Sequence, residues 1–185
     1  MAPRISPSYR LRRTFGIGLA ILFVPILGLT VAVAANGQAS IADVRAATAK
    51  FHDVAAARAA GYAEFRDAAG IACIDSPTGT MGIHYVKGSL VGDGVINPLT
   101  PEALVYEPLP NGGLRLVALE YVEIQAVWHA AHGDASTPTV LGRSLRPVGA
   151  GNRYGLPPFF QRHAWIWSNN PLGQFEEYSS KVSCR

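Results

Sequence analysis

The sequence has few of the features that point directly to a function. Only two of its 185 residues are cysteines, 16% are charged, and it contains no internal repeat. The cysteines do not form a CxxC pair, and the histidines show neither HxH nor HExxH spacing, so no local metal-binding motif is present. The composition fits one globular domain and excludes a repeat protein or a polytopic membrane protein, but it names no reaction.

Positive charge is concentrated at the N-terminus. The first 35 residues contain four arginines and no acidic residue. The rest of the chain carries 12 basic and 13 acidic side chains, so the formal net charge of +3 becomes −1. Because no basic excess remains to bind a phosphate backbone, we expect no nucleic-acid partner.

Residues 1–35 have the layout of a signal peptide. Arginines precede an uncharged, mostly apolar run over residues 15–35, which ends in small residues typical of a cleavage site. Residues 36–185 would then be a single exported domain, periplasmic or extracellular. The apolar run is also long enough to remain as an uncleaved membrane anchor, and Arg12 and Arg13 partly match a twin-arginine export signal. In each case the domain lies outside the cytoplasm, and only an uncleaved segment would attach it to the membrane.

Cys73 and Cys184 are the only thiols of this exported chain. An even number of cysteines in an oxidising compartment predicts a disulfide. The bond would join the C-terminal tail to the segment after the first helix.

Hydrophobic periodicity predicts an α+β domain. Residues 40–61 have a helical apolar stripe, with Ser40 and Asp43 spaced for a capping box and Gly61 as the stop. A second, short helix is expected over residues 124–132. Alternation with a period of two predicts strands in four segments, residues 82–86, 103–107, 114–122 and 159–167. The predicted fold is one antiparallel sheet, open or barrel-like, with an N-terminal helix and a disulfide link.

Four polar side chains occupy strands that are otherwise apolar: His84, Glu107, Glu120 and His163. Buried charges in proteins are paired, neutralised or bound to metal. Two imidazoles with one or two carboxylates would suit a divalent transition metal and leave coordination positions open. The same residues could instead form a hydrogen-bonded network in the core.

The hairpin register decides whether the two glutamates can share an ion. A four-residue loop over residues 110–113 would put Glu107 and Glu120 on one face roughly 13 Å apart, and a two-residue turn would bring them to roughly 7 Å. A three- or five-residue loop would put them on opposite faces. With a four-residue loop or a two-residue turn, the alternation of side chains puts Glu102 and Glu123 on the sheet face opposite Glu107 and Glu120. We expect them to be in solvent there.

A second histidine pair lies on the expected short helix. His129 and His132 are three residues apart, a spacing at which two histidines can share an ion. A polar helix end explains the pair as well.

Several segments form a specific combination. They are MGIHYV at residues 81–86, PEALVYEP at 101–108, HAWIW at 163–167, NPLGQF at 170–175 and the terminal cysteine Cys184. Together they resemble a family of small exported bacterial proteins of unknown function, over nearly all of residues 44–184. The resemblance implies a single exported domain and points to the same four polar residues, but it brings no assigned reaction. Family members have Trp-Asn-Pro where this chain has Tyr-Ser-Ser at residues 178–180.

The leading hypothesis is therefore an exported domain with a polar pocket that binds a divalent transition metal or a small-molecule ligand. One alternative is a metal-free binding module whose pocket has aromatic walls from Tyr85, Tyr121, Trp165 and Trp167, with the His and Glu side chains orienting the ligand. The other is an envelope structural protein whose buried His and Glu side chains only stabilise the core. Neither an enzymatic activity nor an oligomeric state is predicted.

Overall fold

The computed structural model describes residues 39–185, so the predicted signal peptide lies outside the described residues. None of the helices in this part of the chain is long and apolar enough to cross a membrane. The elements are α1 Ile41–Thr48, the 3-10 helix η1 Ala49–His52, α2 Val54–Ala59, β1 Ala63–Glu64, β2 Cys73–Ser76, β3 Gly79–Val86, β4 Ala103–Pro108, β5 Leu114–Ile124, α3 Gln125–His132, β6 Thr139–Val140, β7 Arg143–Ser144, β8 Arg146–Val148 and β9 Phe159–Ala164.

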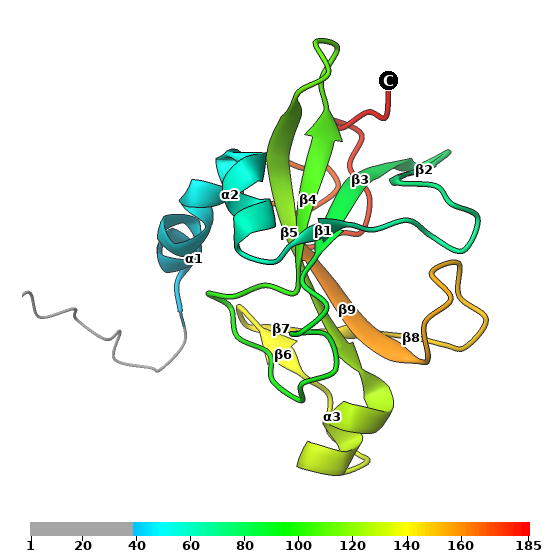
Figure 1. The fold of residues 1–185 in the computed structure, drawn as a ribbon. Helices are drawn as coiled ribbons and strands as arrows, with labels where there is room; N and C mark the ends of the chain where they lie inside the picture. Colours follow the sequence, from blue (N-terminus) through cyan, green and yellow to red (C-terminus); the bar gives the residue numbers. More distant parts are fainter. Residues whose placement is uncertain (1–38) are drawn as a thin grey trace, which may run out of the picture. The chain divides into compact units, whose positions relative to one another are not determined.

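One antiparallel sheet forms the centre of the domain (Figure 1). Its strand order is β1-β3-β4-β5-β9-β8, with β2 also paired to β3, and β6 and β7 make a separate small hairpin. The outermost strands β1 and β8 do not pair with each other within residues 39–185, so this sheet is open. These features confirm the predicted α+β fold with an antiparallel sheet.

The N-terminal helix begins as predicted but does not run through to Gly61. The hydroxyl of Ser40 accepts a hydrogen bond from Asp43 N, and Ser40 N donates to the Asp43 carboxylate, which completes the capping box. The prediction of one continuous helix is wrong because Asp53 adopts an extended conformation and caps a new helix by accepting from Ala55 N at 2.8 Å. An aspartate side chain can bond to the main chain in place of the helical hydrogen bonds. The spacing of the apolar residues does not reveal this interruption of the helix.

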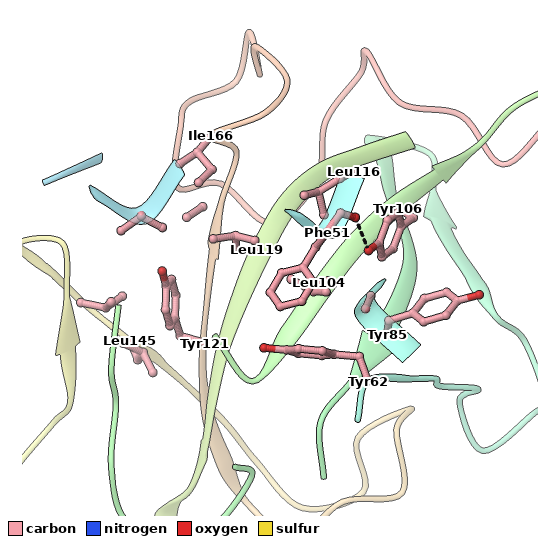
Figure 2. Packing of buried hydrophobic residues seen from close by; sticks show 14 of the residues in the cluster. Phe51, Tyr62, Tyr85, Leu104, Tyr106, Leu116, Leu119, Tyr121, Leu145 and Ile166 are labelled. Carbon is pink, nitrogen blue, oxygen red and sulfur yellow. Dashed lines mark hydrogen bonds between the residues drawn. The ribbon is translucent and has the colours of Figure 1, made fainter. Parts of the chain in front are cut away.

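The helical segments pack against one face of the sheet. In Figure 2 Phe51 lies among Tyr62, Leu104 and Tyr106, all of which belong to a large buried cluster. The Tyr106 hydroxyl donates to Phe51 O at 2.7 Å, so the phenol is hydrogen-bonded as well as buried.

The opposite face has its own apolar cluster and is covered in part by the C-terminal tail. Val105, Ala118 and Trp165 pack there with Val182 of the tail. The predicted disulfide is confirmed, since Cys184 is bonded to Cys73 across 111 residues of sequence. A structural disulfide indicates an oxidising, non-cytoplasmic compartment.

Both faces of the sheet are therefore covered, and this corrects the expectation that Glu102 and Glu123 are in solvent. Their exposed fractions are 1% and 0%. Glu102 accepts a hydrogen bond from Val122 N, while Glu123 accepts from Gly94 N and Ile124 N. Each carboxyl group serves as an acceptor for main-chain donors that are buried with it.

Replacing both cysteines by serine should lower the free energy of unfolding by about 3–5 kcal/mol, because the bond closes a loop of more than 100 residues. Urea unfolding of the oxidised wild type and the double variant would measure the difference. Reduction should bring the wild type to the value of the variant and leave the variant unchanged. A difference below about 1 kcal/mol would show that the tail is held by other contacts.

Burial raises the pKa of Glu102 to about 8, so this carboxyl stays protonated in the folded chain at a pH where the unfolded chain ionises. The folded state therefore binds the extra proton, and the stability of the wild type should fall relative to Glu102→Gln as the pH rises from about 4.5 to about 8. We expect a relative loss of at least about 1.4 kcal/mol, the equivalent of one pKa unit. Urea unfolding at several pH values tests this, with the exposed Glu64→Gln as control. Parallel pH profiles for wild type and Glu102→Gln would contradict it.

Candidate metal centre

Three of the four predicted side chains meet on the sheet face opposite the helices. His84 lies on β3, Glu120 on β5 and His163 on β9, and Glu120 and His163 are direct cross-strand partners. Strand β4 separates β3 from β5, and the residue that it places opposite Glu120 is Ala103. Because alanine projects only a methyl group, the imidazole of His84 and the carboxyl of Glu120 can meet above this strand.

A glycine keeps β3 close to β4 just before His84. Gly82 has a φ of +116°, and a Cβ atom there would lie 2.6 Å from Tyr106 O. No other residue fits this approach without moving the backbone. The local sequence Gly82-Ile83-His84 therefore fixes the position of the first imidazole.

The ligand-type atoms of the three side chains form a tight cluster. His84 Nε2 is 3.3 Å from Glu120 Oε2 and also 3.3 Å from His163 Nε2, and His163 Nδ1 is 3.6 Å from Glu120 Oε1. One candidate atom from each residue lies within 4.8 Å of the other two. Among residues 39–185 these are the only three or more His, Cys, Asp or Glu side chains grouped closely enough to hold an ion.

Burial sets the protonation of the cluster. The exposed fractions of His84, Glu120 and His163 are 5%, 7% and 1%. Burial lowers the pKa of His84 to about 4, and it lowers that of His163 well below its ordinary value. It raises the pKa of Glu120 to about 8. Both imidazoles are therefore neutral at pH 7, the form in which a ring nitrogen has a lone pair for a metal or a hydrogen bond.

This geometry could serve a metal ion or a hydrogen-bonded network. As a network it leaves one of the two close contacts of His84 Nε2 unmade, because this atom carries either one proton or one lone pair and can form a linear hydrogen bond with Glu120 or with His163 but not with both. His163 Nδ1 is buried and has no hydrogen-bond partner in the described part of the chain. Buried polar atoms without partners are rare in folded proteins and mark places that need an explanation.

The cluster lies at one side of a cavity of about 440 Å³. His84, Glu120 and Gln161 line the cavity together with a largely apolar surface, to which Phe65, Val86, Val122, Tyr154, Leu156 and Phe159 contribute. A volume of this size and an apolar lining with a few convergent polar groups are typical of small-molecule sites.

The aromatic walls come from other residues than those predicted. Tyr85 and Tyr121 belong to the core on the helix side. Tyr85 directly follows His84 in its strand and Tyr121 directly follows Glu120, so each tyrosine points to the face opposite the candidate site. Trp165 packs in the tail-side cluster, and Trp167 lies against His52. None of the four lines the cavity.

A loop that sequence reasoning did not connect with the site lines one part of the cavity and is called its cover below. Tyr154 and Leu156 belong to this loop, and the side chain of Asn152 accepts hydrogen bonds from both of their main-chain N–H groups. Arg153 donates twice to the carboxylate of Asp67, at 2.7 and 3.1 Å. The ion pair holds the pKa of Asp67 below its ordinary value and ties the cover to the segment before β2.

Glu107 is the predicted ligand that does not join the cluster. The loop between the paired residues Pro108 and Leu114 has an odd length, which alone would put Glu107 and Glu120 on opposite faces of the sheet. A bulge after Val105 shifts the register by one residue and so returns the two side chains to the same face. Glu107 therefore shares the face of Glu120 at an offset of four residues, about 13 Å. There it pairs with Arg115 and accepts from Ser183 N at 3.1 Å.

The second histidine pair is used in packing. His132 stacks on Trp128 with 3.8 Å between the ring centroids, and its Nε2 lies 2.9 Å from Gly94 O. His129 contacts the ring of Phe160 edge-on. The contacts of these two rings are with aromatic and main-chain groups.

Comparison of the chain with protein-family models, curated proteins and solved structures found no match. The resemblance to a family of exported proteins therefore stays a prediction, and the argument for a function depends on the cluster and its cavity.

Asp67→Asn should loosen the cover of the cavity, because the neutral amide gives up the paired charge–charge contacts to Arg153. We expect the main-chain amides of residues 66–71 and 152–157 to exchange hydrogen at least about tenfold faster, while those of β5 keep their rates. Hydrogen exchange followed by mass spectrometry would measure both. Glu64→Gln removes the neighbouring exposed pair to Arg66 and is the control; equal exchange in Asp67→Asn and the wild type would show that Asn152 alone organises the cover.

Proposed function

We propose that this protein is an exported metal-binding protein that holds a divalent transition metal on His84, Glu120 and His163. The observation that carries the proposal is the buried group of three ligand-type atoms, in which His84 Nε2 lies 3.3 Å from Glu120 Oε2 and 3.3 Å from His163 Nε2. An ion among the three side chains would use the lone pairs that a hydrogen-bonded network cannot satisfy together.

The spacing of the atoms supports this assignment. Ligands at 2.0–2.1 Å from a tetrahedral ion are about 3.3–3.4 Å apart. The two separations from His84 Nε2, to Glu120 Oε2 and to His163 Nε2, are both 3.3 Å. An N–H···O hydrogen bond is ordinarily shorter, near 2.9–3.0 Å.

Two imidazoles and one carboxylate leave coordination positions open. This donor set occurs at catalytic zinc sites and at non-haem iron sites, where the open positions take water or substrate. Since His84 and Glu120 both line the apolar cavity, an open position would face it. The proposal therefore includes a small-molecule ligand bound beside the ion, with no reaction assigned.

Export is part of the same proposal. The arginine-rich and apolar N-terminal layout and the Cys73–Cys184 disulfide support a periplasmic or extracellular domain.

The test is metal content of the full-length chain produced in an exporting bacterium. The protein would be stripped with a chelator, reloaded separately with Zn²⁺, Mn²⁺ and Fe²⁺, and analysed for bound metal. We expect about one ion per chain for at least one metal, and a dissociation constant at least about tenfold larger in Glu120→Gln and His163→Ala. Glu107→Gln is the matched control, because it removes a carboxylate from the same sheet face without touching the cluster.

Unfolding curves of the metal-free variants separate metal binding from folding. Uptake lost in His163→Ala while the chain keeps its cooperative transition supports the proposal. No uptake by the wild type after reloading, or equal uptake by wild type and both cluster variants, would overturn it in favour of a core network. His163→Gln, which conserves a polar side chain, gives the same comparison if His163→Ala does not fold.

A further inference from the structure

Gln161 is a buried polar residue of the cavity that has only one end of its carboxamide satisfied. It lies on β9 two positions before His163, so both side chains are on the same sheet face. Its exposed fraction is 4%, and it lines the cavity beside His84 and Glu120. Its Oε1 atom is buried without a hydrogen-bond partner in residues 39–185.

Glu177 determines which end of the carboxamide is free. Gln161 Nε2 donates to Glu177 Oε1, and a carboxylate only accepts hydrogen bonds. The NH2 group must therefore face Glu177, and the carbonyl oxygen is left as an acceptor. The backbone positions of Gln161 and His163 are about 7 Å apart along the strand.

The rest of the cavity has little to offer a charged ligand. The residues that line it include no lysine or arginine within the described chain, and most are aliphatic or aromatic. A phosphate or a dicarboxylate would be buried there without a countercharge beyond the ion itself, at a high desolvation cost. The cavity selects for a molecule that is mainly apolar.

We infer that the cavity binds a small, largely apolar molecule that coordinates the ion through an oxygen atom and donates a neighbouring N–H or O–H to Gln161 Oε1. This inference rests on the proposed metal site and names the class of its ligand. Gln161 is in this view a specificity-determining residue, because a ligand without the donor would leave the acceptor buried and unpaired.

Benzohydroxamic acid is a probe with each of these parts. Its hydroxamate oxygens bind transition metals, its N–H is next to them, and its phenyl ring fits an apolar cavity. Calorimetric titration of the metal-loaded full chain should give binding to benzohydroxamic acid. N-methylbenzohydroxamic acid, which lacks the N–H, and acetohydroxamic acid, which lacks the ring, should each bind at least about tenfold more weakly.

Two variants connect the differences to residues. Gln161→Met removes the acceptor but keeps a side chain of similar length. This variant should bind benzohydroxamic acid and its N-methyl analogue with about equal affinity, and its metal content should be unchanged. Leu156→Trp fills the apolar part and should weaken benzohydroxamic acid but not acetohydroxamic acid.

The outcomes separate this inference from the proposed function. If the chain takes up metal but binds the two benzohydroxamates equally, or if Gln161→Met keeps the preference, the ligand class is wrong and the metal site stands. If the chain takes up no metal, both proposals fail. Metal uptake together with an N–H preference that depends on Gln161 supports both.

Discussion

The burial of the Glu120 carboxyl group between two imidazoles is the constraint on which the rest of this structure depends. A carboxylate loses much of its hydration on an apolar sheet face and must be neutralised or paired. Burial raises the pKa of Glu120 to about 8 and lowers that of His84 to about 4, so the cluster without an ion is uncharged near neutral pH. The three side chains are thus held together at a cost in desolvation that their mutual contacts, at 3.3–3.6 Å, only partly offset.

The fold places this cluster on paired strands of the sheet, whereas loops complete the wall of the cavity. The three residues come from the strands β3, β5 and β9, which belong to one continuous ladder of hydrogen bonds. The cover is held at separate points, by the Asp67–Arg153 pair and by the side chain of Asn152. Ligand atoms on strands keep their mutual geometry, whereas a cover on loops can adapt to what is bound.

Periodicity was sufficient to predict the antiparallel sheet, the capping box at Ser40 and three members of the cluster, because these depend on residue spacing within single elements. The bulge after Val105, which sets the position of Glu107, is a feature of strand pairing and leaves no mark in the alternation of β4. The prediction that Glu102 is exposed to solvent was wrong for a related reason. A strand buried on both faces still alternates in direction, and only the packing of other segments decides that both directions are interior.

The cavity shows most clearly what local patterns miss. Its aromatic walls come from Phe65 and, much further along the chain, from Tyr154 and Phe159, whereas the predicted walls were the nearest aromatic neighbours in each strand. Tyr85 and Tyr121 point to the other face because side chains alternate along a strand, while Trp165, on the same face as the cluster, packs with Val182 of the tail. The same alternation aligns Gln161 with His163, so a polar acceptor and one of the candidate ligand groups share a largely apolar sheet face. Electrostatic interactions are stronger in such surroundings than in water. An ion held there would polarise a bound oxygen more effectively than one at an exposed site, so an apolar cavity would strengthen the chemistry of the proposed metal centre.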